Sequence, residues 1–69
     1  MDELLRNNLR VLRAVKNISQ EELAQELGVT RQTIHAVEND KYNPSLDLAF
    51  KMARYFNKNI EEIFVYDDE

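Results

Sequence analysis

The sequence predicts an all-α fold of five helices, and three observations support this class. The 69-residue chain has only one Gly and one Pro, whereas a β-sheet protein needs many such residues for its tight turns. Residues that favour the start of a helix recur at short intervals along the chain. Between them, apolar residues recur every three or four positions, which is the spacing of a helix with one buried face.

The first expected helix contains four apolar residues at helical spacing, namely Leu5, Leu9, Leu12 and Val15. This pattern predicts a face that packs on the core. The start of the helix is ambiguous, because a cap fits either Asp2 or the pair Asn7 and Asn8.

Two short helices are expected next. Ser19 and Glu22 have the spacing of a capping box, in which each side chain satisfies a free backbone N–H of the first turn. Gly28 ends that helix, since it adopts the left-handed conformation of a tight turn without strain. Thr30 caps the following helix, whose buried stripe is Ile34 and Val37.

The last two helices are marked in the same way. Ser45 caps a longer helix that Asn57 ends, and its apolar face comprises Leu48, Ala49, Met52, Ala53 and Phe56. Asn59 and Glu62 form another capping box. This box opens a short helix that carries Ile60, Ile63 and Phe64.

The two short helices around Gly28 form a candidate helix-turn-helix. Ala24 is small where the helices would cross closely, and Leu27 and Val29 fill the corner. The apolar stripe of the second helix anchors it, so that its opposite face points outward. The alternative is an ordinary helical hairpin, which would tolerate a larger residue than Ala24.

The charge is distributed unevenly along the chain. The formal net charge is -4, yet residues 6–58 hold all nine basic residues and six of the thirteen acids, which gives +3. Residues 1–5 carry -2 and residues 59–69 carry -5, so the three segments sum to -4. A basic middle segment can contact phosphates even when the ends are acidic, because the field that a ligand meets is local.

The composition argues against several classes of protein. The chain has no Cys and one His, which leaves no disulfide, no ordinary zinc site and no nucleophilic thiol. No phosphate-binding Gly loop and no nucleophile beside a base are apparent, so we expect no enzyme, no metal and no cofactor. No small-molecule ligand is evident. The apolar runs are short, which predicts neither a membrane span nor a signal peptide and favours the cytoplasm.

At these residues the sequence resembles the Cro and phage-repressor family of helix-turn-helix regulators, also called the XRE family. The matching segments, in order, are ISQEELAQELG at 18–28, VTRQTI at 29–34, ENDK at 38–41 and NPS at 43–45. The resemblance extends from about Leu9 to Phe64 and implies a lambda-repressor-like, five-helix DNA-binding domain. One departure is Asp40, where the family often has Gly.

The resemblance also bears on domain organisation. We expect residues 1–69 to form a single DNA-binding domain, with the motif at about 19–38 and dimerisation at about 60–69. Phe64, Val65 and Tyr66 alternate as in a strand, and Leu4 and Leu5 could pair with them. Compact family members have a terminal two-stranded ribbon and dimerise through their C-terminal region. This implies a ribbon from the two termini and a dimer interface at Phe64, Val65 and Tyr66.

The second motif helix carries the expected base contacts. In the family this helix enters the major groove of operator DNA, and two subunits read two half-sites. Arg31 and Gln32 suit this role, because Arg can bind guanine and Gln can bind adenine with two hydrogen bonds each. His35 and Ala36 lie one turn later, where they could touch a base or a thymine methyl. The alternative for these residues is an ordinary solvated face.

Six further residues are expected to contact phosphates, namely Gln20, Thr30, Thr33, Lys41, Tyr42 and Asn43. Gln20 opens the helix before the turn, where free backbone N–H groups favour an anion. Lys41, Tyr42 and Asn43 lie in the loop that grips the DNA backbone in relatives. Tyr42 could instead simply pack.

Glu38 is expected to be structural. It follows Ile34 by four residues and so lies on the inward side of its helix, where a carboxylate needs a partner. The family pairs this position with that of Arg13 in a largely buried ion pair.

Together these features predict a sequence-specific, homodimeric regulator of transcription that binds double-stranded operator DNA. We expect a repressor that acts by occupying the promoter. The alternative is a protein-interaction or antitoxin-like module whose acidic ends contact a basic protein. A pure protein binder would not need a basic middle segment with Arg31, Gln32 and Lys41 on one surface.

Overall fold

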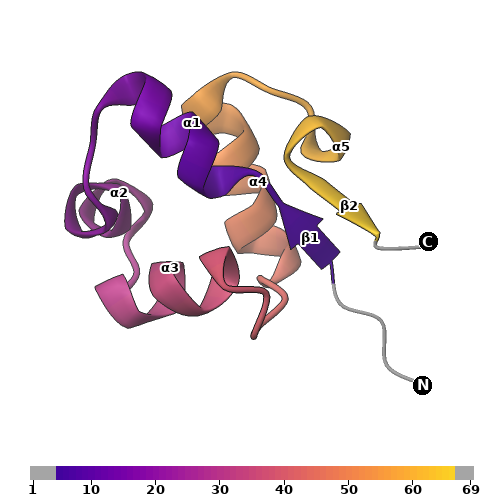
Figure 1. Ribbon diagram of the computed structural model, residues 1–69, viewed down its shortest axis with the longest axis horizontal. Helices are drawn as coiled ribbons and strands as arrows, with labels where there is room; N and C mark the ends of the chain where they lie inside the picture. The colour runs from indigo at the N-terminus through magenta and orange to yellow at the C-terminus, as the bar shows by residue number, and fades with distance from the viewer. Residues whose placement is uncertain (1–4, 67–69) are drawn as a thin grey trace.

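The computed structural model describes residues 5–66 as five helices and two short strands (Figure 1). Their order is β1 (Leu5–Asn7), α1 (Leu9–Lys16), α2 (Gln20–Leu27), α3 (Arg31–Glu38), α4 (Leu46–Phe56), α5 (Ile60–Ile63) and β2 (Phe64–Tyr66). The predicted fold, five helices with a short terminal ribbon, is therefore confirmed. Within residues 5–66, no helix has the length and apolar character needed to cross a membrane.

The predicted caps define where the helices begin. Ser19 Oγ accepts the Glu22 N–H at 3.0 Å, and Glu22 Oε1 accepts the Ser19 N–H at 2.8 Å. Thr30 Oγ1 and Ser45 Oγ each accept the N–H of the residue three positions later, at 3.2 and 3.1 Å. These bonds satisfy backbone donors that have no partner within the helix.

Four residues with positive φ end helices or shape the turns after them. Asn17, Gly28 and Asn57 end α1, α2 and α4 with φ of 59°, 74° and 56°. Asp40, which follows α3, has φ of 59°. Asp and Asn enter the left-handed region more readily than other residues with a side chain. Asp40, at the position where the family often has Gly, therefore adopts the left-handed conformation that Gly adopts freely.

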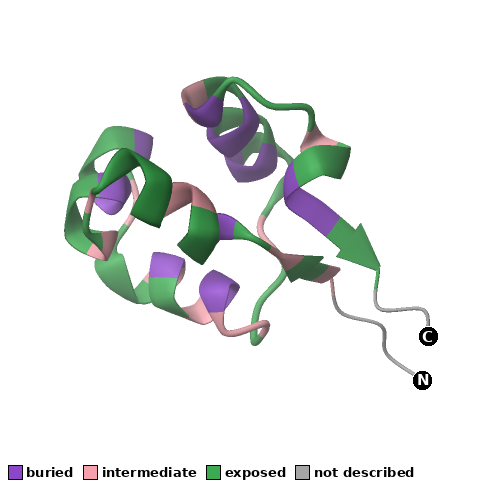
Figure 2. Cartoon of the chain, turned by 45° about the horizontal axis from the view of Figure 1, so that its top comes forward, coloured by how far each residue is buried: buried purple, intermediate pink, exposed green. Residues whose placement is uncertain are grey.

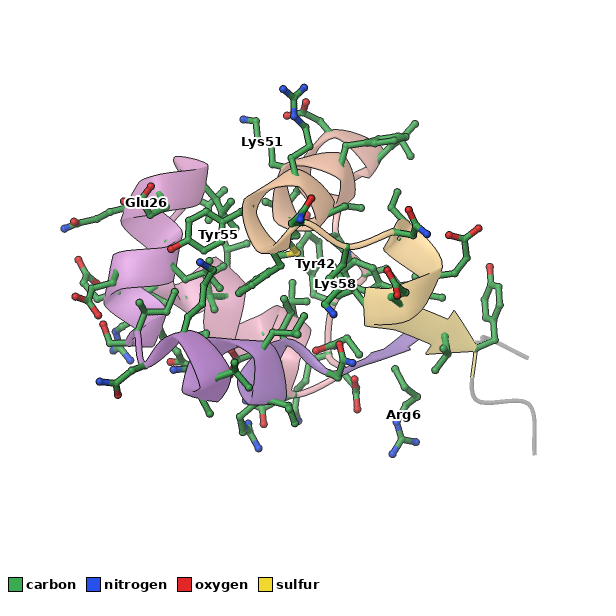
Figure 3. The ribbon with its side chains drawn as sticks, turned by 90° about the horizontal axis from the view of Figure 1, so that it is seen from above. Arg6, Glu26, Tyr42, Lys51, Tyr55 and Lys58 are labelled. Carbon is green, nitrogen blue, oxygen red and sulfur yellow. The ribbon has the colours of Figure 1, made fainter. Side chains whose placement is uncertain are left out.

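The core is formed where α2, α3 and α4 meet α1, α5 and the ribbon. Its most enclosed side chains are Leu9, Leu23, Ile34, Val37, Met52 and Ile63. The predicted apolar faces of α2, α3 and α4 are all buried there. Tyr55 lies between α2 and α4 (Figure 3), and Lys16 Nζ lies 5.1 Å from its ring centroid.

The expected buried face of the first helix was partly wrong. The helix begins at Leu9 with Asn8 as its N-cap, which is the later of the two expected starts, and Leu5 lies in β1. Asp2 lies outside the described residues. Val15 is 79% exposed. A residue six positions after Leu9 lies about 240° around the helix, or about 120° in the other direction, and so points away from the face that packs on the core. The position four residues after Leu9, which does face inward, is occupied by Arg13.

The ribbon joins the two ends of the described chain. β1 and β2 are antiparallel, with Leu5 opposite Tyr66 and Asn7 opposite Phe64. Leu5 thus pairs as expected, while Leu4 lies outside the described residues. Immediately after β1, the Asn8 N–H donates to the Ile63 carbonyl at 3.1 Å, which ties the start of α1 to α5.

Candidate nucleic-acid interface

The turn between α2 and α3 fixes the direction in which α3 points. The Val29 N–H donates to the Ala24 carbonyl at 3.0 Å, and the Gly28 N–H donates to the Gln25 carbonyl at 3.3 Å. Ala24 itself is buried between the helices. As a result α3 has one buried side and one exposed side (Figure 2).

Three of the four residues expected to contact bases lie together on the exposed side of α3. Arg31, Gln32 and His35 are all exposed and line one shallow hollow of about 350 Å³. Ala36 is half-buried and does not line that hollow. The exposed polar side chains of α3 are therefore those of Arg31, Gln32 and His35.

Sequence reasoning missed two residues beside His35. Asn39 Nδ2 donates to the His35 carbonyl at 2.9 Å and lies 3.2 Å from His35 Nε2. Asn39 Oδ1 in turn accepts from Arg10 Nη2 at 3.3 Å. The spacing of four between His35 and Asn39 is a signal that could have revealed their pairing. No sequence signal shows that Arg10, on another helix, reaches the end of α3.

The expected phosphate contacts at the motif have internal partners as well. Thr30 Oγ1 and Thr33 Oγ1 lie 3.1 Å apart. Gln20 is half-buried, and its Nε2 donates to Glu38 Oε1 at 3.0 Å. Because an amide nitrogen carries two hydrogens, Gln20 keeps a second donor while it holds Glu38.

The remaining expected phosphate contacts lie in the loop of residues 39–45, here called the exit loop because it leaves α3. Lys41, Tyr42 and Asn43 are all exposed there. The Lys41 N–H donates back to the Ala36 carbonyl at 3.0 Å, which keeps the start of the loop against α3. The start of the exit loop is therefore held against the C-terminal end of α3.

Arg13 and Glu38 meet as a bidentate pair inside the molecule. Arg13 Nε lies 2.6 Å from Glu38 Oε2, and Arg13 Nη2 lies 3.1 Å from Glu38 Oε1. The guanidinium also donates to the Ile18 carbonyl at 3.0 Å. The Glu38 side chain is 0% exposed and the Arg13 side chain is 17% exposed, so the pair that connects α1 to α3 is largely buried.

The surroundings of Glu38 keep it charged. Burial acts to raise the pKa of its carboxyl, but hydrogen bonds from Arg13 and Gln20 and the charges of Arg13 and Arg10 outweigh this effect. The pKa of Glu38 therefore lies below its ordinary value. The same hydrogen bond raises the pKa of Arg13.

The expected dimer residues differ in exposure. Phe64 is only 6% exposed and packs in the core of this chain, so little of its side chain is accessible at the surface. As the first residue of β2 it faces the helices, whereas Val65 faces the other way. Val65 and Tyr66 are exposed.

A hollow of about 540 Å³ lies beside the ribbon and has mostly apolar walls. Its lining residues are Leu5, Asn43, Pro44, Leu46, Ala49, Ile60, Glu61, Phe64, Val65 and Tyr66. Leu46 is 71% exposed at its rim, and Phe50 follows one turn later on α4, also exposed. Sequence reasoning missed both residues, since their exposure is not visible in the apolar pattern of that helix.

Known proteins resemble this chain in sequence. The family model described as "Helix-turn-helix" matches residues 9–63. The chain is 54% identical over 65 residues to an uncharacterized HTH-type transcriptional regulator of Methanocaldococcus jannaschii, a match that covers 94% of this chain and 98% of that protein. It is 33% identical over 61 residues to the control protein C.SmaI of Serratia marcescens, a match that covers 88% of this chain and 73% of that protein.

A solved structure extends the likeness to three dimensions. The restriction-modification controller protein C.AhdI from Aeromonas hydrophila has a TM-score of 0.70 and 37% sequence identity, with 78% of each chain covered. The family match spans most of the chain, and the first of these relatives is matched over nearly its whole length. The chain therefore belongs to the XRE-type helix-turn-helix family of DNA-binding transcriptional regulators, to which Cro and the phage repressors also belong.

Proposed function

We propose that this chain is a sequence-specific regulator that binds double-stranded operator DNA as a homodimer and represses transcription by occupying the promoter. The observation that carries the proposal is the joint exposure of Arg31, Gln32 and His35 in one hollow of α3. In this proposal residues 1–69 act as one DNA-binding domain, with the motif at about 19–38 and dimerisation at about 60–69.

Base recognition is assigned to the exposed face of α3. The Arg31 guanidinium can donate two hydrogen bonds to guanine, and the Gln32 amide can donate to and accept from adenine. His35 and Ala36 lie further along α3, where an imidazole can bond a base edge and a methyl can contact thymine. This division would make the first turn of α3 the main determinant of sequence preference.

Phosphate binding is assigned to groups before α3, in its first turn and in the exit loop after it. They are Gln20, Thr30, Thr33, Lys41, Tyr42 and Asn43. Contacts of this kind set the register of a protein on the duplex and supply much of its affinity, without distinguishing bases.

Dimerisation is assigned to the apolar hollow beside the ribbon. The occupant that we propose is a second copy of this chain. Leu46 and Tyr66 both line the hollow and are 71% and 62% exposed. Exposed apolar groups grouped around a concave surface are typical of an association site. A symmetric pair on this face would present two copies of α3 to successive turns of the major groove.

The test is fluorescence anisotropy on a duplex selected from a random pool and on a scrambled duplex, across a salt series. Arg31→Ala should weaken binding to the selected duplex by roughly 1 to 3 kcal/mol per half-site and relax preference at one base pair. Lys41→Ala should weaken binding to both duplexes alike and reduce the slope of log affinity against log salt by about one unit.

Lys58→Ala serves as the matched control. The segment between α4 and α5 that carries this exposed lysine lies at the top of Figure 1, whereas α3 lies at the bottom. Removing this charge should leave the salt slope unchanged. If wild-type protein showed no preference for any selected duplex, the DNA-regulator proposal would fail and the protein-interaction alternative would replace it.

Repression requires its own measurement. A footprint of the protein on DNA that carries the selected sequence within a promoter should overlap the polymerase site, and run-off transcription should fall as protein is added. Transcription that rises instead would identify an activator.

A further inference from the structure

Asn7 of β1 contacts the C-terminal end of α3 across 30 or more positions of sequence. Its Nδ2 donates to the Val37 carbonyl at 2.7 Å and lies 3.3 Å from Asp40 Oδ1. Asn7 is partly buried, so these bonds are shielded from competing water. The Asn7 Oδ1 atom has a separate role, since it accepts the Leu9 N–H at 3.1 Å at the start of α1.

The two residues before Asn7 contact the same region. The Leu5 N–H donates to Asn43 Oδ1 at 3.2 Å. Arg6, which projects from the ribbon in Figure 3, has its Nε 3.2 Å from Asp40 Oδ2. This ion pair is largely exposed and is therefore weaker than the bonds of Asn7. All three residues of β1 thus contact the segment from Val37 to Asn43.

β1 is itself held in place by the core. It pairs with β2, and the residue opposite Asn7 is the buried Phe64. The exit loop, in contrast, has little apolar anchoring, because Lys41, Tyr42 and Asn43 are exposed and Asp40 adopts a left-handed conformation. The loop therefore depends on β1 for contacts that fix its path.

We propose that β1 holds the exit loop in the conformation that presents Lys41 and Asn43 to DNA phosphates, and that Asn7 is the principal positioning residue. This inference rests on the proposed function of the loop in binding DNA. A loop ordered before binding loses less conformational freedom on the duplex and binds more tightly. Asn7 acts through the loop and makes no contact with DNA.

The first test uses Asn7→Ser. This variant is uncharged and keeps a hydroxyl that can accept the Leu9 N–H, but its side chain is too short to reach the Val37 carbonyl. We expect it to weaken binding to selected and scrambled duplexes alike, by about threefold to tenfold, and to lower the salt slope, as Lys41→Ala does. A role confined to folding would lower the melting temperature and leave the salt slope of the folded protein unchanged.

A double-mutant cycle distinguishes the loop from a general effect. In the Lys41→Ala background, Asn7→Ser should cause little further loss of affinity, because the contact that it positions is already absent. In the Arg31→Ala background the two losses should multiply, since Arg31 lies at the other end of α3. If the losses of affinity multiplied in both backgrounds, the inference would be overturned.

A charge-neutral exchange gives an independent measurement. Asn7→Asp removes the donor and places a carboxylate beside Asp40, so it should lose affinity and salt slope. Adding Asp40→Asn restores a hydrogen bond in the opposite direction, with the original net charge and with a residue that tolerates the left-handed turn. The pair should regain part of the slope, because the contact between positions 7 and 40 is re-formed while a carboxylate at position 7 still cannot donate to the Val37 carbonyl. A double variant no better than Asn7→Asp would count against a role for the contact between these two residues. Loss of selective binding by the wild-type protein itself would instead refute the proposed function.

Discussion

At the scale of single residues, Glu38 connects the stability of the protein to the position of α3. Its carboxylate receives two hydrogen bonds from Arg13 and one from Gln20, and Arg10 Nε lies 3.6 Å away. Arg13 belongs to α1, Gln20 to α2 and Glu38 to the last turn of α3. One buried acid therefore connects three helices, and each of its two oxygens accepts at least one hydrogen bond.

Breaking this pair from one side should be costly. Arg13→Met leaves a fully enclosed carboxylate without its main partner, and Glu38→Leu leaves a mostly buried guanidinium, so each should lower the free energy of unfolding by about 3 kcal/mol or more. The double variant should recover much of that loss, because two apolar side chains need no partner. Arg31→Ala, on the exposed face of α3, should stay within about 0.5 kcal/mol. Thermal melts of the four variants measure this, and equal melting temperatures would contradict the assigned role.

The lowered pKa of Glu38 makes part of the stability depend on pH. Because its folded-state pKa lies below the ordinary value of 4.5, the unfolded chain takes up this proton at a higher pH than the folded chain. The stabilisation is fully present above about pH 4.5 and is lost as the pH falls through the lower folded pKa. Urea titrations of wild type and Glu38→Gln should therefore differ most near pH 7 and converge toward pH 3. A constant difference over that range would refute the explanation.

At the scale of elements, the helix boundaries were predictable because each depends on a few neighbouring residues. Ser19 with Glu22 and Gly28 after Leu27 each act through backbone geometry within about one turn. The placement of Leu5 in the first helix failed for a different reason. Whether Leu5 continues a helix or pairs in a strand is decided by β2, which lies at the other end of the chain. Such contacts leave no local signal.

The turn inside the helix-turn-helix offers a test at this scale. Gly28 has φ of 74°, and apart from its two neighbours in the chain no residue has a heavy atom within 4 Å of the position that a Cβ would occupy. Gly28→Ala should therefore cost only the strain of a left-handed backbone, about 1 kcal/mol. Gly28→Asn should cost less, since Asn17 and Asn57 already adopt this conformation. Urea denaturation compares the variants, and a loss of several kcal/mol for Ala would indicate a steric clash that the structure lacks.

For the molecule as a whole, the sequence indicated which residues of α3 form an exposed polar face, but it did not show which other residues reach the surface around that face. Arg31, Gln32 and His35 could be assigned because the motif sets which side of α3 points outward. The anchoring of the exit loop by Asn7 and the exposure of Leu46 could not, since both depend on how distant elements pack. The apolar face of α4 is wider than its buried stripe, and only the fold separates the part that packs from the part that remains exposed.

The proposed dimer can be tested against that exposed part. A charge at Leu46, on the rim of the apolar hollow, would have to be desolvated in a symmetric interface, so Leu46→Glu should turn a dimer into an 8.2 kDa monomer at micromolar concentration. Val15→Glu is the matched control, because Val15 is similarly exposed, at 79% against 71% for Leu46, but projects from α1 outside the hollow. It should leave the dimer intact in sedimentation equilibrium.

The same two variants should separate association from DNA reading. Two subunits that bind adjacent major-groove turns require half-sites about 34 Å, or roughly ten base pairs, apart. Leu46→Glu should therefore lose affinity for a duplex with both half-sites and bind an isolated half-site as wild type does, whereas Val15→Glu should bind both like wild type. A wild-type protein that sediments at 8.2 kDa and binds both duplexes equally would show that each chain reads DNA alone.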